Sequence, residues 1–208
     1  MKGILGLLRQ SGAKQAPARE SAFFTTAFAL QGSDAAQLIP WEARAVEIGA
    51  RRLSRSHCVR LLQELWSKDK HMAHLDGDSV ARMAKFFQFA AVPSGRDVIR
   101  QDEYGNFMVV LLCGTIAVDR VQPWGEHLRL AETRPGDILG EMSLLDSGIR
   151  FSACTTLSDC EVAVLGADAL DEMMTDSPKL AAALIALLAR KLSLRLRVVS
   201  ARLSERRH

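Results

Sequence analysis

The sequence predicts an α+β fold, in which an antiparallel sandwich or barrel with flanking helices is preceded by an N-terminal helical lobe and followed by a long C-terminal helix. Three observations predict this. Between Pro93 and Leu165, short apolar or alternating runs are separated by glycine-containing turns, a pattern typical of strands. Apolar residues at helix-like spacings come before this region. A single apolar stripe with a repeat of three to four residues comes after it.

The N-terminal part divides by pattern. Residues 1–20 show little periodicity and predict a flexible tail. Residues 21–78 predict a helical extension, in which Pro40 suits the first turn of a helix because proline has no N–H to leave unpaired. Ser79 to Phe89 predict one more short helix, with Ser79 as its cap. Residues 79–208 are therefore expected to form the main domain.

Seven runs predict the strands, with turns marked by Gly and Pro between them. They are Asp97–Arg100, Phe107–Leu112, Thr115–Asp119, His127–Glu132, Asp137–Leu139, Phe151–Thr156 and Glu161–Leu165. A short helix is expected near Ala167 to Met174. A long helix is expected from Ser177-Pro178 to about Leu203. Its apolar stripe consists of Ile185, Leu188, Leu192, Leu196, Val199 and Leu203.

Composition narrows the class of protein. The chain has 208 residues, of which 48% are hydrophobic, and it has no apolar run long enough to span a membrane. We therefore expect a cytoplasmic protein. The four cysteines are not closely paired, so we expect reduced, structural thiols, with Cys154 and Cys160 in the core. The net charge of +3 is modest, and the basic residues Arg51, Arg52, Arg55 and Arg60 are expected to lie on a solvated helix face.

Residues 134–153 carry the most informative pattern. A Gly140-Glu141 pair follows a predicted strand, and Arg150 comes nine residues after Glu141. This stretch resembles the phosphate-binding cassette of the cyclic-nucleotide-binding domain family, and the resemblance extends over roughly Val80 to Leu203. It implies a β-roll or jelly-roll barrel that binds cyclic AMP or cyclic GMP as a regulatory ligand, with no metal.

The chemistry of these residues fits that ligand. The start of a short helix at Glu141 offers free N–H groups to a phosphate, and Gly140 allows close approach of the backbone. Arg150 supplies a planar charged fork for phosphate oxygens, while the Glu141 carboxylate accepts from a hydroxyl such as the ribose 2′-OH. The alternative is that Glu141 and Arg150 simply pair with each other at the surface. The candidate ligand-binding residues are Gly140, Glu141, Met142, Ser143, Arg150 and Ser152.

Two further implications come from the resemblance. Many family members recognise guanine through a hydroxyl directly after the Arg, so Phe151 favours cyclic AMP, although its ring could crowd the phosphate. If residues 150–152 are regular strand, Arg150 and Ser152 share one face and Phe151 takes the other. The final helix of the family forms a dimer and caps the base, which makes Arg195, Arg197 and Ser200 candidate cap residues.

The function expected is that of a cyclic-nucleotide sensor and not of an enzyme, since no catalytic set or nucleotide loop is apparent. We expect a homodimer through the C-terminal helix and an effector protein that is still unknown. Family members that bind specific DNA sequences continue into a further domain, so we expect no sequence-specific DNA binding. Two alternatives remain: a ligand-free domain of the same fold that acts as a dimeric interaction module, and a nonspecific nucleic-acid binder. His71 and His74 with Cys58 have metal-like spacing, but exposed helix histidines are the preferred interpretation.

Overall fold

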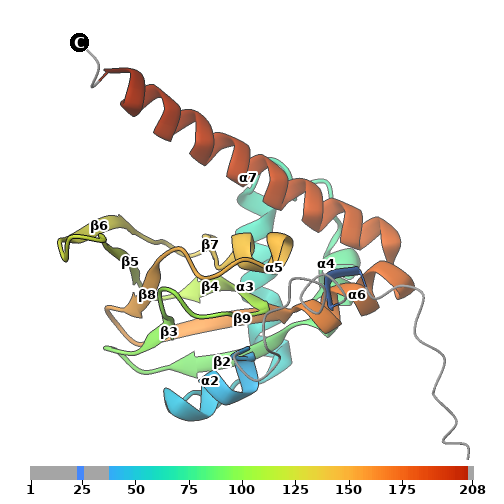
Figure 1. Cartoon of the computed structure of the whole chain (residues 1–208). Helices are drawn as coiled ribbons and strands as arrows, with labels where there is room; N and C mark the ends of the chain where they lie inside the picture. Colours follow the sequence, from blue (N-terminus) through green and yellow to red (C-terminus); the bar gives the residue numbers. More distant parts are fainter. Residues whose placement is uncertain (1–22, 26–37, 206–208) are drawn as a thin grey trace, which may run out of the picture.

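Two antiparallel sheets and a set of helices make up the described part of the protein, which is residues 23–25 and 38–205 of a computed structural model (Figure 1). The strands are β1 (Arg51–Arg52), β2 (Gln88–Val92), β3 (Asp97–Ile99), β4 (Phe107–Cys113), β5 (Ile116–Val121), β6 (His127–Glu132), β7 (Ile138–Leu139), β8 (Ala153–Thr156) and β9 (Cys160–Gly166). The helices are α2 (Trp41–Glu47), α3 (Arg55–Lys68), α4 (Gly77–Met83), the 3-10 helix η2 (Ala84–Phe86), α5 (Glu141–Asp146), α6 (Ala167–Asp176) and α7 (Pro178–Glu205).

The strands pair in the orders β1-β2-β9-β4-β7 and β3-β8-β5-β6. Every strand pairing is antiparallel. Helices precede and follow the sheets, and α7 is the long C-terminal helix, running across the top of the molecule in Figure 1. The predicted α+β fold is thereby confirmed.

Strand β4 divides the hydrophobic interior into two cores. Phe107, Val109 and Leu111 face the inter-sheet core, which we define as the buried cluster between the two sheets. The alternate residues Met108, Val110 and Leu112 face the helix-side core, between the five-stranded sheet and helices α3, α4, α6 and α7. Because both faces are covered, β4 is almost wholly buried, which explains its continuous apolar sequence.

The elements before residue 79 pack against the same two cores. Trp41 of α2 and Ile48, which follows this helix, lie in the inter-sheet core, while α3 places Leu62 and Trp66 in the helix-side core. Strand β1 extends the five-stranded sheet by pairing with β2. The predicted tail, residues 1–20, lies outside the described residues, and the domain boundary at residue 78 stays a prediction.

The predicted helix from Ser79 to Phe89 is wrong in its bounds. Helix α4 ends at Met83, η2 follows, and Gln88 already begins strand β2. The buried side chains of Val80, Met83 and Phe87 fit one helical stripe, but they come from three consecutive elements that pack on one core. Ser79 does not cap the helix, since the Asp76 carboxylate does so by accepting from the Ser79 N–H.

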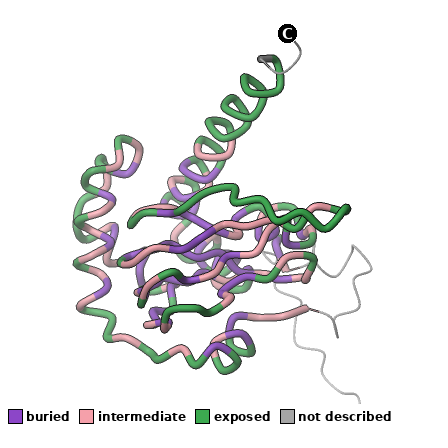
Figure 2. The backbone as a smooth tube through the Cα atoms, turned by 90° about the vertical axis from the view of Figure 1, so that its left-hand side faces the viewer, coloured by how far each residue is buried: buried purple, intermediate pink, exposed green. Residues whose placement is uncertain are grey.

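Helix α7 has two different halves. Its first half is packed, with Leu184, Leu187 and Leu188 in the helix-side core. Its second half projects beyond the sheets and is exposed, as Figure 2 shows. The predicted apolar stripe therefore has a buried start and an exposed end. None of the described helices is long and apolar enough to cross a membrane.

Candidate anion-binding site

The candidate site forms where β7 passes into α5. Gly140 caps α5 with a positive φ of 72°, a conformation that favours glycine. A Cβ atom at this position would lie 2.6 Å from Arg150 Nη1 and 2.7 Å from Ile99 Cδ1. Glycine is therefore favoured at position 140 for two reasons. The backbone has a positive φ, and the Arg150 guanidinium lies too close for a side chain.

Arg150 is the central residue of the site. Its side chain is buried, with 3% of the residue exposed. Nη1 donates to the Gly140 carbonyl at 2.8 Å and Nη2 donates to the Phe107 carbonyl at 2.7 Å. The guanidinium carbon also lies 4.6 Å from the centre of the Phe107 ring. All of these partners are uncharged.

The electrostatics of Arg150 follow from this placement. Burial lowers the pKa of Arg150 to about 10, so the guanidinium remains charged at neutral pH. Within residues 38–205 it has no hydrogen bond to a carboxylate. The charges of Glu103 and Glu141 favour the charged guanidinium, but neither carboxylate accepts a hydrogen bond from it, so an anion placed against its free N–H groups would be stabilised. Two of the five N–H donors are used by the carbonyls, which leaves three for such an anion.

Gly105, one of the glycines in the turns predicted between the strands, also shapes the site. A Cβ atom on Gly105 would lie 2.7 Å from both Nε and Nη2 of Arg150. Its φ is not positive, so space and not backbone conformation is the constraint. A glycine in a loop that a distant Arg approaches has no sequence signal of its own, which is why it was missed.

Glu141 is the second charged residue and is also buried, with 3% exposed. Burial raises the pKa of this carboxyl, while the nearby charges of Arg195, Arg150 and Lys191 oppose the rise. Its partner is the Arg195 guanidinium from α7, and Arg195 Nη2 also donates to the Ile138 carbonyl at 2.8 Å. Glu141 and Arg150 therefore do not form the simple surface pair considered as an alternative.

The other candidate residues are spread around this centre. Ser143 is buried in α5, whereas Met142 on the same helix is exposed. Ser152 is half-buried in the loop before β8. Arg197 and Ser200 are exposed on α7. Of the three predicted cap residues, the structure brings Arg195 into contact with the cassette.

Phe151 does not fill the site. Strand β8 begins at Ala153, two residues later than the predicted start at Phe151, so the strand alternation expected for residues 150–152 does not apply. Phe151 is half-exposed, and its ring lies under the Arg120 guanidinium at 4.0 Å. Residues 151 and 152 form a bend before β8, and Phe151 packs against Arg120 in this bend.

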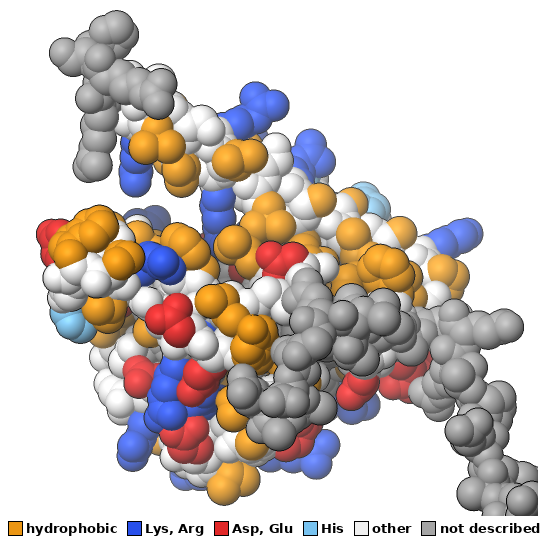
Figure 3. All heavy atoms as spheres, viewed as in Figure 1, with side chains coloured by type: hydrophobic (Ala, Val, Ile, Leu, Met, Phe, Trp, Pro, Cys, Tyr) orange, Lys and Arg blue, Asp and Glu red, His pale blue; other side chains and the backbone are white. Residues whose placement is uncertain are grey.

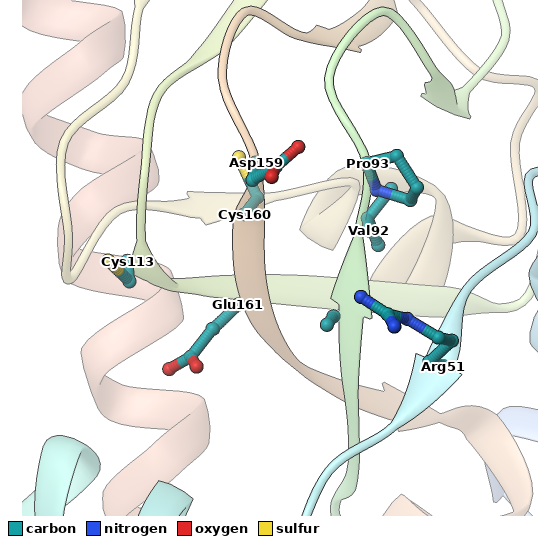
Figure 4. Close-up of a pocket in the computed structure, with 8 residues that line it drawn as sticks. Arg51, Val92, Pro93, Cys113, Asp159, Cys160 and Glu161 are labelled. Atoms are coloured by element: carbon teal, nitrogen blue, oxygen red, sulfur yellow. The ribbon is translucent and has the colours of Figure 1, made fainter.

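A separate cavity of about 300 Å³ lies at one edge of the five-stranded sheet (Figure 4). Two of its carboxylates already have partners, since Glu161 contacts His57 Nε2 at 2.9 Å and Asp159 accepts from the Ser94 N–H at 2.9 Å. It is lined by Arg51, Ala91, Val92, Pro93, Cys113, Asp159, Cys160 and Glu161. This cavity is distinct from the Arg150 site.

The potential metal ligands and the thiols of the described residues form no metal site. In the part of the chain that the structure describes, His, Cys, Asp and Glu side chains form no group of three that could hold a metal ion. Cys154 and Cys160 are buried, as predicted, and both are free thiols. Burial raises the pKa of Cys154 to about 12, so this thiol stays protonated.

Comparison with known proteins identifies relatives of this region. Residues 90–177 match the family model described as "Cyclic nucleotide-binding domain". The chain is 29% identical over 118 residues to a CRP-like cAMP-activated global transcriptional regulator of Mycobacterium tuberculosis, covering 57% of this chain and 53% of that protein. It is 32% identical over 107 residues to a cyclic AMP receptor protein of Thermus thermophilus, covering 51% and 50%. The chain thus spans about half the length of these relatives.

A solved structure shares the fold. A cyclic nucleotide-binding domain from Methylobacillus flagellatus superimposes with a TM-score of 0.68, covering 74% of this chain and 86% of that chain, at 24% sequence identity. At this identity the likeness supports the β-roll architecture.

Substituting Gly105 tests whether this glycine makes room for Arg150. Gly105→Ala should lower the free energy of unfolding by about 1–3 kcal/mol, because Arg150 must move and leave buried carbonyls unpaired. Urea unfolding measures this. Gly77→Ala is the control, since its Cβ would meet only the end of the Gln63 side chain, at 3.2 Å. Equal effects of the two substitutions would contradict the assignment.

Glu141→Gln tests the raised pKa. A carboxyl whose pKa is higher in the folded than in the unfolded chain binds its proton more tightly when folded, so its ionisation destabilises the fold as pH rises from the unfolded to the folded pKa. Glu141→Gln removes this effect and should be the more stable protein at neutral pH, with the difference shrinking in acid.

Urea unfolding of wild type and Glu141→Gln across acidic to neutral pH measures that difference. Glu64→Gln is a control of opposite sign, because Lys68 lowers the pKa of the exposed Glu64 carboxyl. A Glu141→Gln protein that lost stability relative to wild type with rising pH would show that the ionised form is favoured in the fold.

Proposed function

We propose that the chain is a non-enzymatic sensor that binds a cyclic nucleotide, with cyclic AMP preferred to cyclic GMP, because residues 90–177 match the cyclic nucleotide-binding domain family. The observation that carries the proposal is the buried Arg150 guanidinium, to which no carboxylate of residues 23–25 or 38–205 is hydrogen-bonded. A cyclic phosphodiester is a monoanion with two exocyclic oxygens, which matches the free donors of a planar guanidinium.

The rest of the ligand has matching partners around Arg150. The first amides of α5, at Glu141, Met142 and Ser143, have no carbonyl partner within the helix, and in this proposal those of Met142 and Ser143 donate to the phosphate. The Glu141 carboxylate accepts from the ribose 2′-OH, since two oxygens can serve both this hydroxyl and Arg195. Ser152 is a second phosphate contact in this proposal.

In this proposal the purine base of the cyclic nucleotide lies toward α7. Arg195 already reaches Glu141, and Lys191 donates to the Gly136 carbonyl at 3.4 Å, so α7 is tied to the cassette at two points. Arg197 and Ser200 remain proposed cap residues on the exposed half of this helix. The preference for cyclic AMP rests on Phe151, which lacks the hydroxyl associated with guanine recognition in the family.

Signal transfer is proposed to run through a homodimer. Leu196, Val199 and Leu203 continue the apolar stripe of α7 but are more than half exposed, at 66%, 51% and 60%. The space-filling view shows hydrophobic side chains along this part of α7 among Lys and Arg residues (Figure 3). A second copy of α7 would cover them, and an effector protein encoded separately would respond. The cytoplasmic location expected from the sequence remains a prediction.

One observation favours a second candidate function, a ligand-free interaction module. The site groups have partners within the chain, since Arg150 bonds two carbonyls and Glu141 pairs with Arg195. A domain that had lost its ligand would retain such contacts. Direct measurement of binding distinguishes the two candidates.

Calorimetric titration with cyclic AMP and cyclic GMP, up to millimolar concentration, tests the sensor. We expect tighter binding of cyclic AMP, and a loss of affinity of about 10- to 100-fold in Arg150→Lys, because lysine keeps the charge but not the fork. Arg60→Ala, an exposed arginine on α3, should bind as wild type does.

The same titration with 2′-deoxy cyclic AMP examines Glu141. The deoxy ligand should bind wild type more weakly, whereas Glu141→Gln should discriminate less between the two ligands. Absence of binding of any cyclic nucleotide would reject the sensor and favour the interaction module.

Sedimentation equilibrium tests the dimer. Val199→Glu together with Leu203→Glu should convert a dimer to a monomer, because like charges would face each other across the two α7 helices. Val46→Glu, at an 83% exposed site on α2, is the control and should leave the association unchanged. A wild-type protein that sediments as a monomer would contradict this interface.

A further inference from the structure

A segment outside the family match lies next to Arg150. We define the docking segment as residues 38–48, which comprise helix α2 and the residues on either side. In Figure 1 helix α2 lies below β2, at the lower edge of the molecule. Its Trp41 and Ile48 are 5% and 3% exposed in the inter-sheet core, so the segment is packed into the domain.

Phe107 connects this segment to Arg150 through side chains. The Trp41 and Phe107 rings meet edge to face, with centroids 5.6 Å apart. The Phe107 ring is also the ring beside the Arg150 guanidinium, at 4.6 Å, and the Phe107 carbonyl accepts from Arg150 Nη2 at 2.7 Å. Phe107 therefore contacts both Trp41 and Arg150, the residue that is proposed to bind the phosphate.

A second connection runs through the backbone at Tyr104. The Ile39 N–H donates to the Tyr104 carbonyl at 2.9 Å, and Tyr104 forms a bridge with Ile149 on its other side. The neighbouring Glu103 carbonyl accepts from the Arg150 N–H at 2.8 Å. The loop before β4 is thus held between the docking segment and the residues that carry Arg150.

Charged groups reinforce this second connection. Arg44 of α2 is 1% exposed and pairs with Glu103 as well as with Glu47 at 2.6 Å. Arg100 contacts Glu47 and lies 3.8 Å from Glu103. Removal of the docking segment would leave Glu103 without its buried partner, so the loop that accepts from Arg150 depends on α2.

We propose that the docking segment positions Arg150 for the ligand, with Trp41 as a positioning residue that acts through Phe107. The inference rests on the proposed function. A phosphate-binding guanidinium is effective when it is fixed before the ligand arrives, because the ligand then does not have to order it. Trp41 fixes the Phe107 ring, and Phe107 fixes one side of Arg150.

Coupling of this kind is reciprocal. If docking of residues 38–48 favours the ligand-binding position of Arg150, then bound ligand must favour docking of residues 38–48 by the same factor. The docking segment is therefore a route by which occupancy of the site reaches a surface of the molecule remote from α7. The affinity of a partner that contacts α2 would therefore depend on whether ligand is bound at Arg150.

Trp66 provides a matched control. Like Trp41 it is a buried tryptophan in an edge-to-face pair, here with Phe87 at 6.3 Å, but it lies in the helix-side core. Trp41→Ala and Trp66→Ala remove the same side chain from the two cores. A purely structural role for Trp41 predicts equal consequences, whereas a positioning role predicts consequences at Arg150 for Trp41 alone.

The experiment uses the full chain and two readouts. Titration with cyclic AMP should show affinity weakened by about 2- to 10-fold in Trp41→Ala, the range of an aromatic pair, and restored in Trp41→Phe. Trp66→Ala should stay within about twofold of wild type. In an Arg150→Lys background, Trp41→Ala should have no additional effect, because the residue it positions has been replaced.

Hydrogen exchange provides the readout that needs no ligand. In Trp41→Ala the amides of Asp102 and Arg150, which bond across this loop, should exchange faster than in wild type, and in Trp66→Ala they should not. Unchanged exchange in Trp41→Ala, or equal acceleration in both variants, would overturn the positioning role. If wild type bound no cyclic nucleotide, the proposed function would fail, and hydrogen exchange alone would decide whether Trp41 positions Arg150.

Discussion

The arrangement of this domain depends on keeping one guanidinium charged and buried. Arg150 is held by the carbonyls of Gly140 and Phe107, by the Phe107 ring and by the absence of side chains at Gly105 and Gly140. Carbonyl dipoles offset part of the lost hydration, and the charges of Glu103 and Glu141 favour the charged guanidinium. Within the described residues, however, no carboxylate accepts a hydrogen bond from Arg150, and this distinguishes the site from a structural ion pair.

Helix α7 has a first half that packs in the helix-side core and a second half that is exposed. Leu184, Leu187 and Leu188 stabilise the helix-side core, whereas Leu196, Val199 and Leu203 are left exposed by the described part of the chain. Arg195 lies at the junction between these halves and reaches Glu141. Any ligand hydroxyl that bonds Glu141 must share the carboxylate with Arg195, so the position of the projecting half is linked to the chemistry of the site.

The sequence predicted the features that depend on local pattern. Short apolar or alternating runs located β4, β5 and β6 closely, and the spacing of Gly140, Glu141 and Arg150 located the candidate site, because each signal is contained in a short stretch. Strand β2 was missed, since buried residues from Val80 to Phe87 fit a helical stripe although a 3-10 turn interrupts it. The contacts of Gly105 and Arg195 with the cassette join residues 45 and 54 positions apart, and no local pattern encodes such pairs.

The charges around the site indicate the kind of ligand it can accept. Arg150, Arg195 and Lys191 are positive and act on Glu141, which is the one carboxylate bonded to any of the three within the described residues. The ionised cluster therefore has an excess of positive charge, and a monoanion reduces this excess without reversing it. A neutral nucleoside would offer its hydroxyls to Glu141 but would leave the free N–H donors of Arg150 without an anionic acceptor. Because Gly105 and Gly140 bring the backbone within contact of the guanidinium, the anion that reaches it must also be compact.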